Sequence, residues 1–273
     1  GSTAVGRRIM AGCADQVKRV TLELGGKSAN IVFADADLEK AAAAAPGGVF
    51  DNSGQDCCAR SRVLVQRSVY DRFLDLFVQA ARGWKVGDPM AADTAMGPLV
   101  TAAHKAKVEG YIAKGVEEGA KLVVDGRGHK VDGHEQGFFT GGTLFDHVKP
   151  GMTIYKEKIF GPVLSVVRVH DFAEAVDLIN AHEFGNGVSC FTRDGNVARE
   201  FSRRIQVGMV GINVPIPVPM AFHSFGGWKS SLFGDHHMHG PEGIRFYTRL
   251  KTITSRWPTG IRAGADFVMP TMK

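Results

Sequence analysis

Apolar and polar positions alternate along the chain with two periods, one typical of helices and one typical of strands. Apolar side chains three or four residues apart predict a helix that begins near Ser68, where Ser68 and Asp71 have the spacing of a capping box. The apolar face of this helix consists of Val69, Phe73, Leu76, Phe77 and Ala80. Further helices are predicted at 102–119 and 195–206, and one more after Asp171, its predicted N-cap.

Short apolar, β-branched runs lie between these helices. They predict strands at 121–125, which reads as buried, and at 163–169, 187–192 and 207–213. Helices that alternate with strands indicate an α/β fold with a mostly parallel, twisted sheet and helices on its faces.

The C-terminal part has a different pattern. Segment 214–231 contains three prolines and two glycines, which predicts a long ordered loop. Segment 245–255 is rich in aromatic and β-branched residues and predicts a strand near the end of the chain. An unpaired strand edge is a liability that a subunit interface would cover.

Composition and charge exclude several classes of protein. The chain has 273 residues, of which 44% are hydrophobic and 22% charged, as expected for a globular protein with roughly one or two cores. No apolar run approaches the roughly 18 residues that span a bilayer, and the first residues lack the apolar core of a signal peptide, so no membrane partner is expected. The net charge of +5 is spread among acidic residues, which argues against a nucleic-acid surface.

Cysteine and histidine usage predicts a reducing, cytoplasmic setting and no metal. The four cysteines form neither a C-x-x-C pair nor a disulfide framework. The ten histidines gather most densely in DHHMHG at 235–240, whose spacing matches no zinc signature.

The stretch NSGQDCCARSR carries the candidate nucleophile. A reactive thiol needs access to substrate and a field that favours the thiolate, which Arg60 and Arg62 would supply and Asp56 would oppose. Taken alone, Cys57 and Cys58 fit equally the description of small buried side chains. A second candidate is Glu23, which ends a β-rich run immediately before a glycine pair, where a carboxylate is a candidate general base.

Five segments carry a family resemblance. LELGGKSANIVFADADL, NSGQDCCA, MGPLV, EKIFGPV and FGGWKSS follow one another as they do in NAD-dependent aldehyde dehydrogenases. From residue 1 to about residue 258 the chain resembles the C-terminal catalytic half of that family. The resemblance implies that Cys57 adds to an aldehyde, that the thiohemiacetal gives up hydride to NAD or NADP, and that Glu23 activates the water that releases the acid from the thioester.

The same resemblance implies a cofactor site. GSTAVG is similar to the turn that begins a helix beside the cofactor pyrophosphate, so Ser2 and the helix N-terminus would bind phosphate. Gly25 would also bind the cofactor, and Phe160 would lie near the nicotinamide. Lys158 stands where the family has a glutamate that binds ribose hydroxyls, and a lysine offers no acceptor.

The rear of the chain, from about residue 96 to residue 258, resembles the methylmalonate-semialdehyde dehydrogenase branch, in which CoA rather than water takes the acyl group. The front does not, because that branch usually lacks a glutamate at Glu23 and has an arginine at the position of Asp56. An anion in the substrate pocket would repel a carboxylate-bearing aldehyde. Phe225 resembles another wall of that pocket. Hydrolysis, CoA acylation and a fold retained without turnover therefore all stay open.

The resemblance also divides the chain. Residues 1–22 correspond to a remnant of the NAD-binding domain, 23–244 to the catalytic domain, 245–258 to an oligomerisation strand and 259–273 to a tail. Because the family pairs strands across subunits, it implies a homo-oligomer, either a dimer or a tetramer. Pro46, inside the helix that leads to the nucleophile loop, is expected to kink or break that helix.

Overall fold

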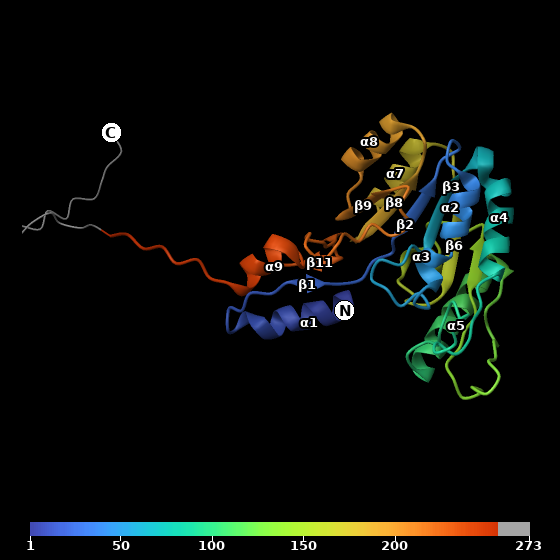
Figure 1. Cartoon of the computed structure of the whole chain (residues 1–273), viewed down its shortest axis with the longest axis horizontal. Coiled ribbons are helices and arrows are strands. Elements are labelled where there is room, and N and C mark those ends of the chain that lie inside the picture. Colours follow the sequence, from blue (N-terminus) through green and yellow to red (C-terminus); the bar gives the residue numbers. More distant parts are fainter. Residues whose placement is uncertain (256–273) are drawn as a thin grey trace, which may run out of the picture.

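A seven-stranded sheet forms the centre of the protein, with strand order β4-β5-β6-β3-β2-β8-β9 (Figure 1). The computed structural model describes residues 1–255. The strands are β2 (Ala29–Val32), β3 (Arg62–Gln66), β4 (Lys121–Val124), β5 (Thr143–Asp146), β6 (Val163–Val169), β8 (Gly187–Phe191) and β9 (Met209–Ile212). Every neighbouring pair is parallel except β4 and β5. The predicted mostly parallel sheet is confirmed.

Helices cover both faces of this sheet. They are α2 (Leu38–Ala44), α3 (Gly47–Phe50), α4 (Tyr70–Arg82), α5 (Ala102–Glu117), α6 (Thr153–Lys156), α7 (Phe172–Asn180) and α8 (Gly195–Arg204). Successive strand residues point to opposite faces, so Ile31 joins the core beneath α5 to α8 while Val32 joins the core beneath α2 to α4. Two hydrophobic cores therefore hold the sheet between two helical layers.

The predicted strand at 121–125 is real, but its predicted burial is wrong. β4 pairs only with β5, in the antiparallel direction, and its residues are exposed or half-buried. An edge strand keeps one side open to solvent, so its apolar residues cover helix side chains without becoming core.

Local sequence signals predicted one helix N-terminus correctly and another incorrectly. Asp171 caps α7, because its carboxylate accepts a hydrogen bond of 3.0 Å from the backbone N–H of Glu174. The predicted capping box at Ser68 is wrong. A 3-10 helix occupies Arg67–Val69, so α4 begins after Ser68 and has no side-chain cap.

Pro46 breaks the helix that leads to the nucleophile loop, as expected. α2 ends at Ala44, and α3 begins at Gly47, with Pro46 at its N-cap position. Because proline has no N–H to donate to the preceding turn, the break lies where that bond would have been.

A second part of the protein lies beside the sheet (Figure 1). It contains α1 (Thr3–Ala14), β1 (Leu22–Glu23), β11 (Leu232–Phe233) and α9 (Gly240–Tyr247), and β1 pairs antiparallel with β11. Another short antiparallel pair joins β7 (Phe184–Gly185) to β10 (Trp228–Lys229). Residues 214–227 contain no helix or strand, which agrees with the predicted loop.

The oligomerisation strand predicted at 245–258 is wrong over its described residues. Residues 245–247 end α9, and residues 248–255 form neither helix nor strand. Pro241 lies in the first turn of α9, and Glu242 forms an ion pair with Arg245 one turn later. These local helix signals prevail because no strand of the described chain pairs with the segment. Residues 256–258 and the predicted tail at 259–273 lie outside the described residues, and the division at residue 22 stays a prediction.

Candidate active site

A cavity of about 390 Å³ connects the N-terminus of α1 with the cysteine pair. Five of the residues predicted from sequence line it, namely Ser2, Gly25, Cys57, Lys158 and Phe160. These residues come from three distant parts of the chain, so only the folded protein brings them together.

Close main-chain packing holds the loop that carries Cys57. Gly54 has φ +71, and a Cβ built on it would lie 2.0 Å from the carbonyl oxygen of Gly161. A Cβ on Gly26 would lie 2.8 Å from the carbonyl oxygen of Cys57 and 2.7 Å from Cβ of Asn186. Glycine is thus required at both contacts, one with the turn after Phe160 and one with the segment before β8.

The two neighbouring thiols behave as a coupled pair. Cys57 is half-buried and faces the cavity, whereas Cys58 is buried. Hydrogen bonding between the thiols lowers the pKa of Cys58 to about 6 and raises the pKa of Cys57. The pair therefore releases one proton readily and holds the second. Of the two sulfurs, Cys57 is the one that a ligand in the cavity reaches.

Buried Arg60 supplies positive charge next to this pair, as the sequence suggested. Its guanidinium donates to the carbonyl oxygen of Cys58, and its charge favours the thiolate of Cys58. Burial lowers the pKa of Arg60 itself to about 10, so the side chain remains charged at neutral pH.

Glu23 is held at the end of β1 by two donors. Its Oε1 accepts from the backbone N–H of Gly227 at 2.8 Å, and its Oε2 accepts from Nδ2 of Asn186 at 3.3 Å. Burial raises the pKa of Glu23 to about 7, and the Cys57 thiol adds to the rise. A carboxyl group that titrates near neutrality suits a general base. Sequence reasoning missed Asn186 and Gly227, and no sequence signal pointed to either.

Lys158 lies over the nucleophile loop. Its Nζ donates to the carbonyl oxygens of Asp56 and Cys57, both at 2.8 Å, and lies 5.3 Å from the ring centre of Phe160. Burial lowers the pKa of Lys158 to about 8. A basic side chain thus touches the main chain of the candidate nucleophile itself.

Ser2 begins α1 as its N-cap. Its hydroxyl accepts a hydrogen bond of 3.3 Å from the backbone N–H of Val5, and the amino group of Gly1 donates to the carbonyl oxygen of Glu23 at 3.0 Å. The end of α1 with free N–H groups is therefore fixed next to β1 and opens on the cavity.

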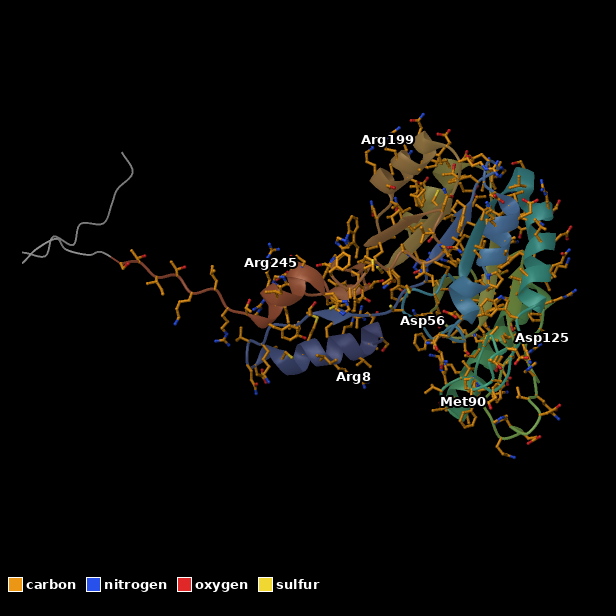
Figure 2. The ribbon with its side chains drawn as sticks, viewed as in Figure 1. Arg8, Asp56, Met90, Asp125, Arg199 and Arg245 are labelled. Carbon is orange, nitrogen blue, oxygen red and sulfur yellow. The ribbon has the colours of Figure 1, made fainter. Side chains whose placement is uncertain are left out.

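Two predicted pocket residues lie outside this cavity. Asp56 accepts a hydrogen bond of 3.3 Å from Nδ2 of Asn52, and Figure 2 shows it at the junction of the sheet with the α1–β1 part. Phe225 bridges to Met238 and packs edge-on against His239, with ring centres 5.1 Å apart. Their roles in binding substrate stay predictions.

The described residues contain no metal site and no spanning helix. Among residues 1–255, no three histidine, cysteine, aspartate or glutamate side chains could hold a metal ion together. In the histidine-rich stretch, Nδ1 of His236 instead pairs with Oε2 of Glu242 at 2.7 Å. No helix in this part of the chain has the length and apolar character needed to cross a membrane.

Sequence comparison agrees with the resemblance seen in the motifs. The protein-family model described as "Aldehyde dehydrogenase family" matches residues 1–253. The chain belongs to the aldehyde dehydrogenase family. It is therefore related to oxidoreductases that act on aldehydes.

Individual relatives indicate the branch of the aldehyde dehydrogenase family to which this chain is similar. The chain is 52% identical to a malonate-semialdehyde dehydrogenase of Pseudomonas aeruginosa over 100% of its own length and 55% of the relative's. The crystal structure of a methylmalonate-semialdehyde dehydrogenase from Oceanimonas doudoroffii is similar with a TM-score of 0.93 and 50% identity, covering 95% of this chain and 54% of that one. The chain spans about half the length of the relatives it matches.

NAD is the cofactor seen in related aldehyde dehydrogenases. The NAD⁺ complex of an aldehyde dehydrogenase from Bacillus cereus is similar with a TM-score of 0.87 and 37% identity, over 92% of this chain and 50% of that one. In the present aldehyde dehydrogenase chain, the α1 N-terminus and Lys107 suit the phosphates of a dinucleotide. Lys158 has no acceptor for ribose hydroxyls. The described residues fit the anionic part of NAD and not its ribose.

Proposed function

We propose that this chain is the catalytic half of a semialdehyde dehydrogenase whose Cys57 carries the acyl group as a thioester. The observation that carries the proposal is the thiol of Cys57 open to a cavity beside a partner thiol that deprotonates near neutral pH. The names of the relatives point to malonate-type semialdehydes. The resemblance of the rear of the chain to the methylmalonate-semialdehyde dehydrogenase branch favours transfer of the acyl group to CoA.

The chemistry assigned to these side chains begins with the thiol. The thiolate of Cys57 adds to the aldehyde carbon, and the charge on the coupled pair is favoured by Arg60 and Lys158. NAD, when bound, supplies the oxidising power by accepting hydride. The resulting thioester stays on Cys57 until a second nucleophile attacks its carbonyl carbon.

Cavity charge supports an anionic substrate. The described lining includes the basic side chains of His104, Lys107 and Lys158 and no acidic one. Asp56, whose carboxylate was expected to repel a second carboxylate, contacts Asn52 and does not line the cavity. A semialdehyde that bears a carboxylate thus meets positive charge where it approaches Cys57.

Hydrolysis is the second candidate outcome, and Glu23 favours it. A carboxyl group with a pKa of about 7, oriented by Gly227 and Asn186, is suited to take a proton from water near the thioester. With CoA as acceptor, the same carboxylate would take the proton of the CoA thiol.

The proposal includes assembly of the protein into a homo-oligomer in the cytoplasm. The large side chains of Tyr247, Leu250 and Ile253 are 86%, 97% and 79% exposed, and exposed apolar side chains along one segment suit contact with a second copy. The interface proposed now is the end of α9 with the segment after it, in place of a strand.

The deciding experiment measures NADH and acyl products with malonate semialdehyde and with propanal, each with and without CoA. Acyl-CoA that forms only with CoA supports the first candidate, and acid formed without CoA supports hydrolysis. Equal rates for both aldehydes would contradict the anionic substrate. No product, together with an unreactive Cys57, would leave a fold without turnover.

A further inference from the structure

Lys158 is anchored directly to the residue that would carry the acyl group. Its Nζ contacts the carbonyl oxygens of Asp56 and Cys57 at 2.8 Å each, and it lines the same cavity as the Cys57 thiol. The aliphatic part of the side chain packs beside Gly25, where a Cβ built on the glycine would lie at an ordinary contact distance of 3.6 Å from Cδ of Lys158. The nitrogen therefore has a fixed position beside the cysteine.

The two hydrogen bonds leave this nitrogen one free direction. Nζ is tetrahedral, and Cε and the two N–H donors to Asp56 and Cys57 fill three of its four positions. A charged ammonium would place a third N–H in the fourth position, whereas a neutral amine would place its lone pair there. Both donors are satisfied in the neutral form, so the neutral amine loses no hydrogen bond and gains a nucleophilic lone pair.

We infer that Lys158 is a self-acylation site, to which an acyl group carried by Cys57 passes from sulfur to nitrogen. The inference rests on the proposed role of Cys57 as nucleophile. The C–S bond of the thioester breaks, a C–N bond to Nζ forms, and the proton lost by the amine goes to the departing thiolate. No atom changes oxidation state, and the products are a free thiol and an amide.

Burial and position favour this transfer at Lys158 over other lysines. Burial lowers its pKa to about 8 against the opposing effect of nearby negative charge, so about a tenth of the side chain is neutral at pH 7. Lys107 lines the cavity but makes no hydrogen bond to the cysteine loop in the described structure. Lys27 also has a lowered pKa, but it is only 2% exposed and does not line the cavity.

Acylation would change the cavity. An amide at Lys158 removes one of the positive charges that face an anionic substrate. Because a thioester is a stronger acyl donor than an amide, the transfer would run in one direction. If no acceptor removes the acyl group from Cys57, the transfer would therefore take a positive charge from the substrate site and weaken binding of an anionic substrate.

The test uses p-nitrophenyl acetate, which acylates thiols without any dinucleotide. The full chain is incubated with it and sampled over time, and half of each sample is treated with neutral hydroxylamine, which cleaves thioesters and leaves amides. Peptide mapping then locates the acetyl groups. We expect a hydroxylamine-sensitive acetyl on Cys57 first and a resistant acetyl on Lys158 later.

Matched variants separate the transfer from direct reaction with the ester. Because reaction between groups held together far exceeds reaction from solution, Cys57→Ala is expected to slow acetylation of Lys158 by about tenfold or more. Lys158→Arg keeps the charge, retains the thioester and gives no resistant acetyl in the cavity. Lys121→Arg, on the edge strand β4 and outside the cavity, is the control and leaves the transfer unchanged. The transfer rate should rise about tenfold per pH unit up to pH 7 and level off above the pKa of Lys158.

Two results would overturn the inference and leave the proposed function intact. One is equal acetylation of Lys158 in the Cys57→Ala variant, and the other is a lasting thioester on Cys57 with no acetyl on Lys158. A chain that forms no thioester at Cys57 would remove the nucleophile from the proposed function as well.

Discussion

Replacing Gly54 with alanine should destabilise the protein and displace the nucleophile loop. Gly54 has φ +71, and a Cβ there would lie 2.0 Å from the oxygen and 2.2 Å from the carbon of the Gly161 carbonyl. A left-handed alanine costs about 1–2 kcal/mol. Forcing packed main chain apart adds roughly 1–3 kcal/mol. We therefore expect Gly54→Ala to lose about 2–5 kcal/mol of unfolding free energy, a large part of a typical total.

Gly110 offers a matched control. It lies inside α5, and a Cβ built on it meets no atom within 4 Å. Alanine has the better helix propensity, so Gly110→Ala should gain about 1 kcal/mol. The same glycine-to-alanine substitution should therefore lower the free energy of unfolding at Gly54 and raise it at Gly110.

Thermal unfolding followed by circular dichroism measures both variants. Since 1 kcal/mol corresponds to roughly 2–4 °C in a chain of this size, the midpoint should fall by about 4 °C or more for Gly54→Ala and rise by about 2 °C for Gly110→Ala. Iodoacetamide labelling of Cys57 in the folded protein should change only in the first variant. A Gly54→Ala midpoint within about 1 °C of the parent would refute the reasoning.

Five further outcomes follow from the structure. Iodoacetamide should label Cys57 before Cys58, because only Cys57 faces the cavity; peptide mapping that shows the reverse contradicts the assignment. Glu23→Gln should slow release of acetyl from Cys57 by about 10²-fold at pH 8. In the parent, that release should fall as pH drops through the raised pKa of about 7, because the carboxylate that acts as base is then protonated. Lys158→Glu restores an acceptor for ribose and should tighten NAD binding by about tenfold in calorimetry, since one hydrogen bond to a charged group contributes about 1.5–3 kcal/mol; unchanged binding would count against the ribose argument. Leu250→Glu should lower self-association in sedimentation at micromolar concentration, and a parent that is already monomeric would remove the proposed interface.

Elements with purely local signals were predicted well. β6 occupies 163–169 as its apolar run indicates, and Asp171 caps α7 because an aspartate before a helical pattern needs only its own neighbours. The 245–255 segment failed because β-rich composition describes a strand only where a partner strand exists, and here the turn at Gly240–Pro241 starts a helix first.

The candidate site was predicted in part. Motif resemblance proposed Cys57 and Glu23, yet nothing in the local sequence indicates that Asn186 and Gly227 hold the Glu23 carboxyl group, because these partners lie 163 and 204 residues away. The raised pKa of Glu23 has the same origin, since burial depends on every segment that closes over it. The contact of Lys158 with the cysteine loop also spans about a hundred residues and became visible only in the fold.

The short pairing of β1 with β11 has a consequence for how the two halves of the reaction are coupled. Cys57 lies on a loop that packs against the large sheet, whereas Glu23 lies on a two-residue strand whose one partner among residues 1–255 is another two-residue strand. Small peripheral pairs open at a lower free energy than central strands. Partial opening of this pair would carry the base away while the nucleophile stays in place, so the protein would still take up an acyl group and would no longer release it. Opening of this short pair would thus control release of the acyl group and not its uptake.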